Sequence, residues 1–167
     1  MVKTFDPHAP VSELSKAREA LKAMAPAIVE LGVVRESLGP DAEPGELYAA
    51  AEIARERRDV ALFDDIVGCL KRIAESTTLD GIRLHTVWTL TSALHRTLVA
   101  DIKHSPKPSL TKEQLLHAQS VLKRLVQHSR VLADRPDDPL KGVRGPAKWA
   151  NDWITQGLAK LEPVAAG

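Results

Sequence analysis

The chain has 167 residues, of which 44% are hydrophobic, 27% are charged and only 4% are aromatic. These proportions exclude a disordered chain and fit one globular domain that buries its own core. With so few aromatic residues, the core must consist mainly of Leu, Val, Ile and Ala, which favours closely packed helices. The single cysteine, Cys69, excludes an internal disulfide and any metal or redox motif that needs two thiols.

The N-terminal sequence MVKTFDPHAP lacks the apolar run of a signal peptide, and no stretch approaches the roughly 20 apolar residues of a membrane span. We therefore expect a cytoplasmic protein without membrane contact. The net charge of +1 conceals an asymmetry, because residues 1–76 carry 10 Lys and Arg against 14 Asp and Glu, whereas residues 77–167 carry 13 against 8. This asymmetry indicates an anionic or acidic partner for the basic part, unless local ion pairing accounts for it.

The first expected helix begins at Ser12, after an N-terminal extension of residues 1–11, and ends at Gly39-Pro40. Pro26 interrupts this segment, so we expect a kink or two abutting helices there. One face carries an apolar stripe, which comprises Ala17, Leu21, Met24, Ile28 and Leu31.

The linker PDAEPGE leads to a second expected helix, from Pro44 to about Arg58. Proline suits this first helical turn because the amide it lacks would have no helical partner there. Asp59 can cap a third helix. The apolar positions of the third helix predict a buried face that comprises Leu62, Phe63, Ile66, Leu70 and Ile73.

The fourth expected helix runs from about Leu79 to Lys103 and contains the stretch LHTVWTLTSALHRTLVADIK. Most of its circumference is apolar, which is typical of a buried central helix. At about 100° per residue, its polar side chains form one narrow file that comprises His85, Thr89, Ser92, Arg96 and Lys103. We expect the helix to meet solvent along this file, where its cations either face an anionic ligand or pair with acids of the N-terminal helices.

The segment HSPKPS ends the fourth helix, and the capping box Thr111-Lys-Glu-Gln114 opens a fifth, which we expect to reach Ala133. The buried arc of the fifth helix comprises Leu115, Ala118, Val121, Leu122, Leu125 and Val126. Lys112, Lys123 and Arg130 share a file about 20° wide on the opposite side. Cations spaced by helical turns can follow a phosphate backbone, although a merely solvated face has the same pattern.

The last expected helix runs from Pro146 to about Leu161, and a loose tail of residues 163–167 follows the domain. Its expected inner face comprises Trp149, Trp153, Ile154, Leu158 and Leu161. The preceding loop, KGVRGPAKW, carries Lys141, Arg144 and Lys148 beside two glycines that permit close backbone approach. It leads into a helix N-terminus, which favours an anion, although an ordinary turn is the alternative interpretation. Trp149, if exposed, could instead stack on an unpaired base.

Short loops between amphipathic helices predict an all-α fold, a bundle of five or six mostly antiparallel helices over residues 12–162. We find no catalytic motif and expect no metal or cofactor. HExxH and HxxxH are absent, and the R-x(4–6)-H spacing of helical ribonucleases is not matched. The acid pairs Glu43/Glu46 and Glu56/Asp59 lie too close together for the magnesium site of helical nucleotide pyrophosphohydrolases. Cys69 is expected to be a small core residue.

In size, helicity and basic face, the chain resembles the small helical subunits of CRISPR ribonucleoprotein complexes, which line the backbone of bound nucleic acid. This architectural resemblance implies a non-catalytic, nucleic-acid-binding module within a larger complex. A protein–protein module, either an adaptor or a toxin-neutralising partner that binds an acidic protein, is the alternative, and a homo-oligomer is compatible with both. A third possibility is an enzyme or small-ligand binder that uses His85, Arg96 and His117.

Overall fold

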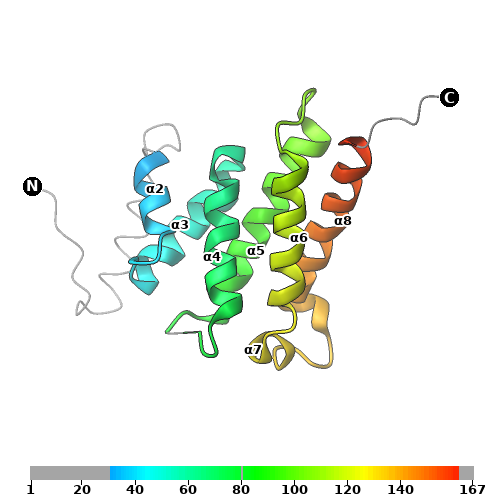
Figure 1. Cartoon of the computed structure of the whole chain (residues 1–167). Helices are drawn as coiled ribbons and strands as arrows, with labels where there is room; N and C mark the ends of the chain where they lie inside the picture. Colours follow the sequence, from blue (N-terminus) through cyan, green and yellow to red (C-terminus); the bar gives the residue numbers. More distant parts are fainter. Residues whose placement is uncertain (1–30, 80, 162–167) are drawn as a thin grey trace, which may run out of the picture.

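The computed structural model describes residues 31–79 and 81–161, and every regular element within them is helical (Figure 1). The described α-helices are α2 (Leu31–Ser37), α3 (Pro44–Arg57), α4 (Phe63–Glu75), α5 (Leu84–Val99), α6 (Lys112–Leu125), α7 (Ser129–Leu132) and α8 (Arg144–Leu161). Short 3-10 turns occupy Val60–Leu62 and Pro139–Lys141, and a π-helical turn occupies Ala100–His104. The all-α prediction is confirmed. Apart from α2, the expected first helix lies outside the described residues, as do the N-terminal extension and the tail.

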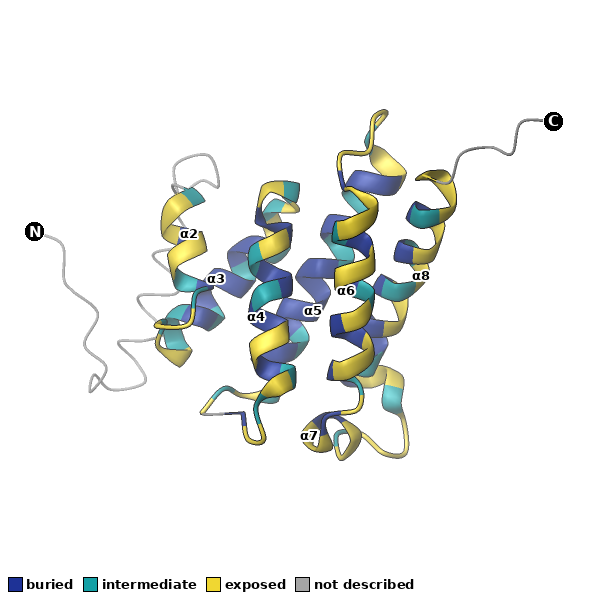
Figure 2. Ribbon diagram, in the orientation of Figure 1, coloured by how far each residue is buried: buried dark blue, intermediate teal, exposed yellow. Residues whose placement is uncertain are grey.

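Helix α5 forms the centre of the arrangement, with α3, α4 and α8 packed around it. Helices α4, α5, α6 and α8 run in alternating directions (Figure 1). Leu90, Leu94 and Leu98 of α5 have no exposed surface, and much of the helix is buried in Figure 2. Its buried hydroxyls are satisfied within the helix, because Thr91 donates to the carbonyl of Val87 at 2.7 Å and Thr97 to that of Ala93 at 2.8 Å.

Local capping signals place several helix ends where the sequence predicts them. Pro44 is the first residue of α3, and Arg58 ends that helix in the left-handed region at φ 53°. Thr111 and Gln114 form the reciprocal hydrogen bonds of a capping box at the start of α6. Asp59 also acts as a cap, but its carboxylate accepts from the amide of Ala61 and opens the 3-10 turn that precedes α4.

The fourth helix begins at Leu84 rather than at the expected Leu79. The amide of Ile82 donates to the carbonyl of Leu79 at 2.8 Å, and Gly81 adopts φ +83°, which an α-helix cannot accommodate. Leu79 itself is buried, so its apolar side chain belongs to the core without belonging to the helix.

The expected fifth helix divides into α6 and α7, because the buried His128 stands between them. Its Nδ1 accepts from the amide of Arg130 at 3.0 Å and so caps α7. This leaves Nε2 as the protonated nitrogen, which donates to the carbonyl of Ser76 at 2.7 Å. The predicted single file of Lys112, Lys123 and Arg130 is therefore wrong, since Arg130 lies on a different helix.

Helix α8 buries Ile154 and half-buries Trp153 and Leu158, as predicted, but its predicted inner face is wrong at two positions. Trp149 is 42% exposed and Leu161 is 43% exposed. Besides Ile154 and Pro146, the buried side of α8 consists of small residues, namely Gly145, Ala147, Ala150 and Gly157. A Cβ added at Gly157 would lie 2.8 Å from Ile102 Cδ1 and 3.1 Å from Leu115 Cδ1, so any larger residue there would displace these side-chain ends.

Truncation of Leu94 tests the central position of α5. Leu94→Ala should lower the free energy of unfolding by about 2–5 kcal/mol. The truncation leaves a cavity that the surrounding core residues cannot fill completely. Leu116→Ala is the matched control, since Leu116 is 43% exposed and its truncation should cost less than about 1 kcal/mol. Urea unfolding followed by circular dichroism measures both changes, and equal effects would contradict the assigned burial.

Candidate functional site

A basic groove lies between α6 and α8, with a volume of about 760 Å³. Three of its ten lining residues are cationic and none is acidic. The lining comprises Leu116, Gln119, Ser120, Leu122, Lys123, Val126, Arg144, Ala147, Lys148 and Asn151. Tertiary packing thus joins Lys123, predicted on one helix, to Arg144 and Lys148, predicted in a separate loop.

The three cations of the groove are held to different degrees. Arg144 is fixed, because its Nη2 donates to the carbonyls of Leu132 at 3.3 Å and Asp134 at 3.1 Å. These two hydrogen bonds connect the C-terminal end of α7 to the first residue of α8. Lys148 forms an exposed ion pair of 3.1 Å with Asp152, one helical turn away. Lys123 is exposed and forms no ion pair with any residue that the structure describes. The two lysines can therefore turn toward a bound anion, whereas Arg144 provides a fixed charge.

Two glycines of the loop before α8, Gly142 and Gly145, permit close contact with their backbone, as predicted. The groups in contact with them belong to the protein itself. A Cβ at Gly145 would collide with the carbonyl oxygen of Leu140, and one at Gly142 would collide with the carboxylate of Asp134. These glycines thus serve the packing of the loop. At the start of α8, the amide of Gly145 donates to the carbonyl of Gly142 at 3.1 Å, and that of Ala147 donates to the carbonyl of Val143 at 3.2 Å.

Three other predicted cations lie outside the groove lining. Lys112 is exposed in the first turn of α6, and Lys141 forms a 3.5 Å ion pair with Asp138. Arg130 lines a separate shallow pocket of about 430 Å³ beside Arg83. The sequence therefore placed the correct residue types on the surface, while only three of these six cations lie together.

The polar file of α5 forms a seam with α3 rather than an open slit along its whole length. Thr89 and Ser92 are buried, and Arg55 of α3 donates from Nε to Ser92 Oγ at 2.9 Å. The Arg55 guanidinium also lies 5.2 Å from the ring centroid of Trp88. His85 stacks on Trp88 with centroids 5.9 Å apart. No local pattern in the sequence points to Arg55, because its partner Ser92 lies 37 residues away on another helix.

Arg96 lies at the solvent-facing end of this seam, with a 3.9 Å ion pair to Glu56 of α3. Pairing with an acid of the preceding helices was one of the two interpretations open for this residue. Burial lowers the pKa of Arg96, and the neighbouring guanidiniums of Arg55 and Arg58 lower it further, while Glu56 opposes them. Arg55, Arg58 and Glu56 therefore all act on the charge of Arg96.

His95 and Trp149 lie on the other side of α5, where the helix meets α8. Their ring centroids are 5.9 Å apart. Burial lowers the pKa of His95, and the charge of Arg96 lowers it further, so this imidazole is neutral at pH 7. Trp149 therefore packs on a neutral ring and keeps much of its surface in solvent.

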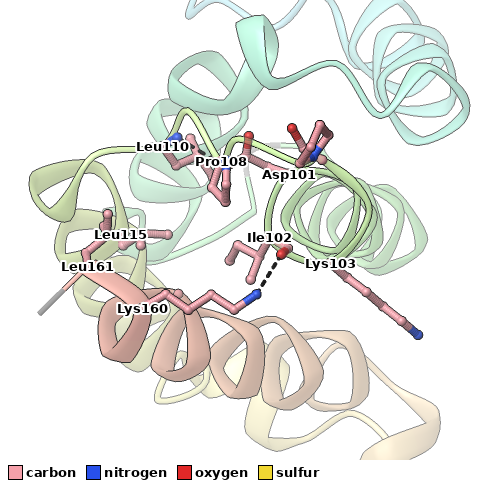
Figure 3. Close-up of a pocket in the computed structure, with 11 residues that line it drawn as sticks. Asp101, Ile102, Lys103, Pro108, Leu110, Leu115, Lys160 and Leu161 are labelled. Atoms are coloured by element: carbon pink, nitrogen blue, oxygen red, sulfur yellow. Dashed lines mark hydrogen bonds between the residues drawn. The ribbon is translucent and has the colours of Figure 1, made fainter. Parts of the chain in front are cut away.

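Lys103 belongs to a pocket of about 360 Å³ at the end of α5, although in Figure 3 its ammonium points away from Lys160. Lys160 donates to the carbonyl of Ile102, within the π-helical turn, at 2.9 Å. The buried Asp101 accepts from the amides of Ser109 and Leu110 at 2.9 and 3.1 Å. Both side chains thus fix the turn into the α5–α6 loop, which is a structural role.

Acidic, thiol and imidazole side chains are scattered over the described part of the chain. They contain no group of three or more His, Cys, Asp or Glu placed to hold a metal ion. His117 is exposed on α6, which packs mainly on α4 and α8, whereas His85 and Arg96 belong to α5. Among residues 31–79 and 81–161, no helix combines the length and apolar character needed to cross a membrane.

Cys69 is a buried core residue, as predicted, and burial raises the pKa of its thiol to about 11, with Arg72 acting in the opposite direction. Because only the thiolate is nucleophilic, alkylation by iodoacetamide at pH 8 should be at least about 100-fold slower in the native protein than in urea. Mass spectrometry of timed samples measures both rates. Comparable rates would show that Cys69 is accessible and ionised in the folded state.

Comparison with known proteins finds no family model, no curated protein and no solved structure that matches the chain.

Proposed function

We propose that this protein is a non-catalytic helical module that contacts the backbone of a nucleic acid through the basic groove. The observation that carries the proposal is the convergence of Lys123, Arg144 and Lys148 on one groove without an acid in its lining. A groove lined in this way accepts an extended anion, because each phosphate that meets a cation releases condensed counterions. The amide and hydroxyl groups of Gln119, Ser120 and Asn151 can add hydrogen bonds to phosphate or sugar.

The groove is too small to account for tight binding by itself. Three phosphate contacts predict a log–log salt slope of about −2.7 for duplex and about −2.1 for a single strand, which is modest among nucleic-acid-binding proteins. We therefore propose that the protein acts as a subunit of a larger ribonucleoprotein complex, as its architectural resemblance implies. In that setting, neighbouring subunits supply further contacts along the same strand.

A protein partner is the second candidate, because the groove also offers apolar surface. Leu116 is 43% exposed at its edge, and the partly buried Val126 contributes to its floor. An acidic amphipathic helix would place its apolar side on these residues and its carboxylates against the cations. Its affinity would depend strongly on Leu116, whereas affinity for a phosphate backbone would not.

The double variant Lys123→Gln/Lys148→Gln tests the nucleic-acid proposal. It should weaken binding to oligonucleotides of every sequence, and the salt slope measured by fluorescence anisotropy should shrink by about 1.8 units for duplex. The fold should survive, because both side chains are exposed and the Lys148–Asp152 surface pair contributes only about 0–1 kcal/mol.

The matched control for this variant is Lys71→Gln/Lys107→Gln. Lys71 forms an i,i+4 ion pair with Glu75, as Lys148 does with Asp152, and Lys107 is exposed like Lys123. The control removes the same charge away from the groove and should leave the slope nearly unchanged. Equal losses in both double variants would mean that net charge alone is responsible. Binding that Leu116→Ala abolishes and salt barely affects would favour the protein partner.

A further inference from the structure

The basic groove between α6 and α8 has an apolar lining that phosphate contacts do not use. The apolar side chains of this lining are Leu116, Leu122, Val126 and Ala147. Leu122 and Ala147 are each 2% exposed, Val126 is partly buried and Leu116 is 43% exposed. A charged, hydrated phosphate gains nothing from such a surface, because only apolar groups are stabilised by leaving water there. The apolar lining therefore calls for a ligand that has an apolar face beside its charge.

The uncharged polar side chains of the groove also offer more than a phosphate can use. The side chains of Gln119, Ser120 and Asn151 form no hydrogen bond with any residue that the structure describes. Each of them can both donate and accept a hydrogen bond. A phosphate diester oxygen only accepts, whereas the edges of the bases present donors as well as acceptors. These side chains therefore match a base at least as well as they match the backbone.

The size of the groove decides which form of nucleic acid can bring a base into it. Its volume of about 760 Å³ lies in the range of sites that enclose a molecule as large as a nucleotide. A double helix keeps its bases paired and stacked inside, so it would reach only the exposed Lys123 and Lys148 with its outer phosphates. A single strand can turn one base out of the stack and place it in the groove.

From these features we infer that the occupant of the groove is a single-stranded nucleic acid with one unstacked base against Leu116 and Val126. The phosphates on either side of this base meet Lys123, Arg144 and Lys148. The inference rests on the nucleic-acid contact proposed above and adds to it the kind of strand that is bound. Because the contact uses the face of the base, it tolerates every base and is open to both RNA and DNA.

Fluorescence anisotropy with a labelled single strand and with the duplex formed from it, at the same salt concentration, tests the inference. Charge alone favours the duplex, whose phosphates are more closely spaced and release more counterions for each contact. We nevertheless expect the single strand to bind at least about fivefold more tightly, because only its bases reach the apolar lining. A duplex that binds as tightly as the single strand, or more tightly, would overturn the inference.

Leu116→Ala should weaken binding of the single strand about fivefold and leave binding of the duplex unchanged. The salt slope should stay the same, because the variant keeps all three cations of the groove. Leu161→Ala is the matched control, since Leu161 is also 43% exposed on a helix but does not line the groove. Circular dichroism checks that both variants fold. If the two variants bind the single strand equally well, the apolar lining is not in contact with a base.

An oligomer of abasic tetrahydrofuran residues separates the contribution of the base from the flexibility of a single strand. It has the same phosphate spacing and the same freedom of the backbone, but it has no base to place on Leu116. It should bind at least about fivefold more weakly than the normal single strand and should not respond to Leu116→Ala. An abasic oligomer that binds as tightly as the normal strand would show that the backbone alone occupies the groove.

The Lys123→Gln/Lys148→Gln variant, measured beside these probes, distinguishes a failure of this inference from a failure of the proposed function. If this variant and the Lys71→Gln/Lys107→Gln control bind the single strand equally well, the groove does not contact nucleic acid and both ideas are wrong. If it loses affinity and salt dependence as expected, but single strand, duplex and abasic oligomer bind the unaltered protein alike, only the inference about the base is wrong.

Discussion

The structure depends on the burial of α5, a helix that is apolar around most of its circumference. Leu90, Leu94 and Leu98 have no exposed surface, so neighbouring helices must cover this rod on several sides. Helices α3, α4 and α8 provide that cover. The buried threonines of α5 donate to carbonyls of their own helix and therefore need no partner from elsewhere. One arc of α5 carries polar side chains, and the seam between α3 and α5 forms there.

The basic groove is a consequence of how closely α8 can approach this core. Gly157 allows the backbone of α8 to lie against Ile102 and Leu115, while Gly145 allows contact with Leu140. With small residues buried at these positions, Trp149 and Lys148 of α8 face outward. Arg144 then fixes the end of α7 through two carbonyls. The same packing that stabilises the fold therefore places the cations of α8 beside Lys123 of α6.

The cations of the basic groove and those of the α3–α5 seam differ in how firmly the protein holds them. The groove has two exposed lysines that can adjust to an extended backbone, and its attraction is easily screened by salt. The seam has three guanidiniums, of which Arg55 is fixed by Ser92 and Trp88 and Arg96 is partly desolvated.

The sequence by itself determined the helical class, the capping box at Thr111, the start of α3 at Pro44 and the buried arcs of α4 and α6. These features depend on periodicity and on contacts within a few residues, so local patterns reveal them. Tertiary structure alone decided that His128 ends the fifth helix, because its ring bonds to Ser76, 52 residues earlier in the chain. It also decided that Trp149 faces solvent and that Arg55 meets Ser92, 37 residues away. Hydrophobicity could not predict these outcomes, since close helix packing selects small residues over large ones and brings together cations that no local spacing relates.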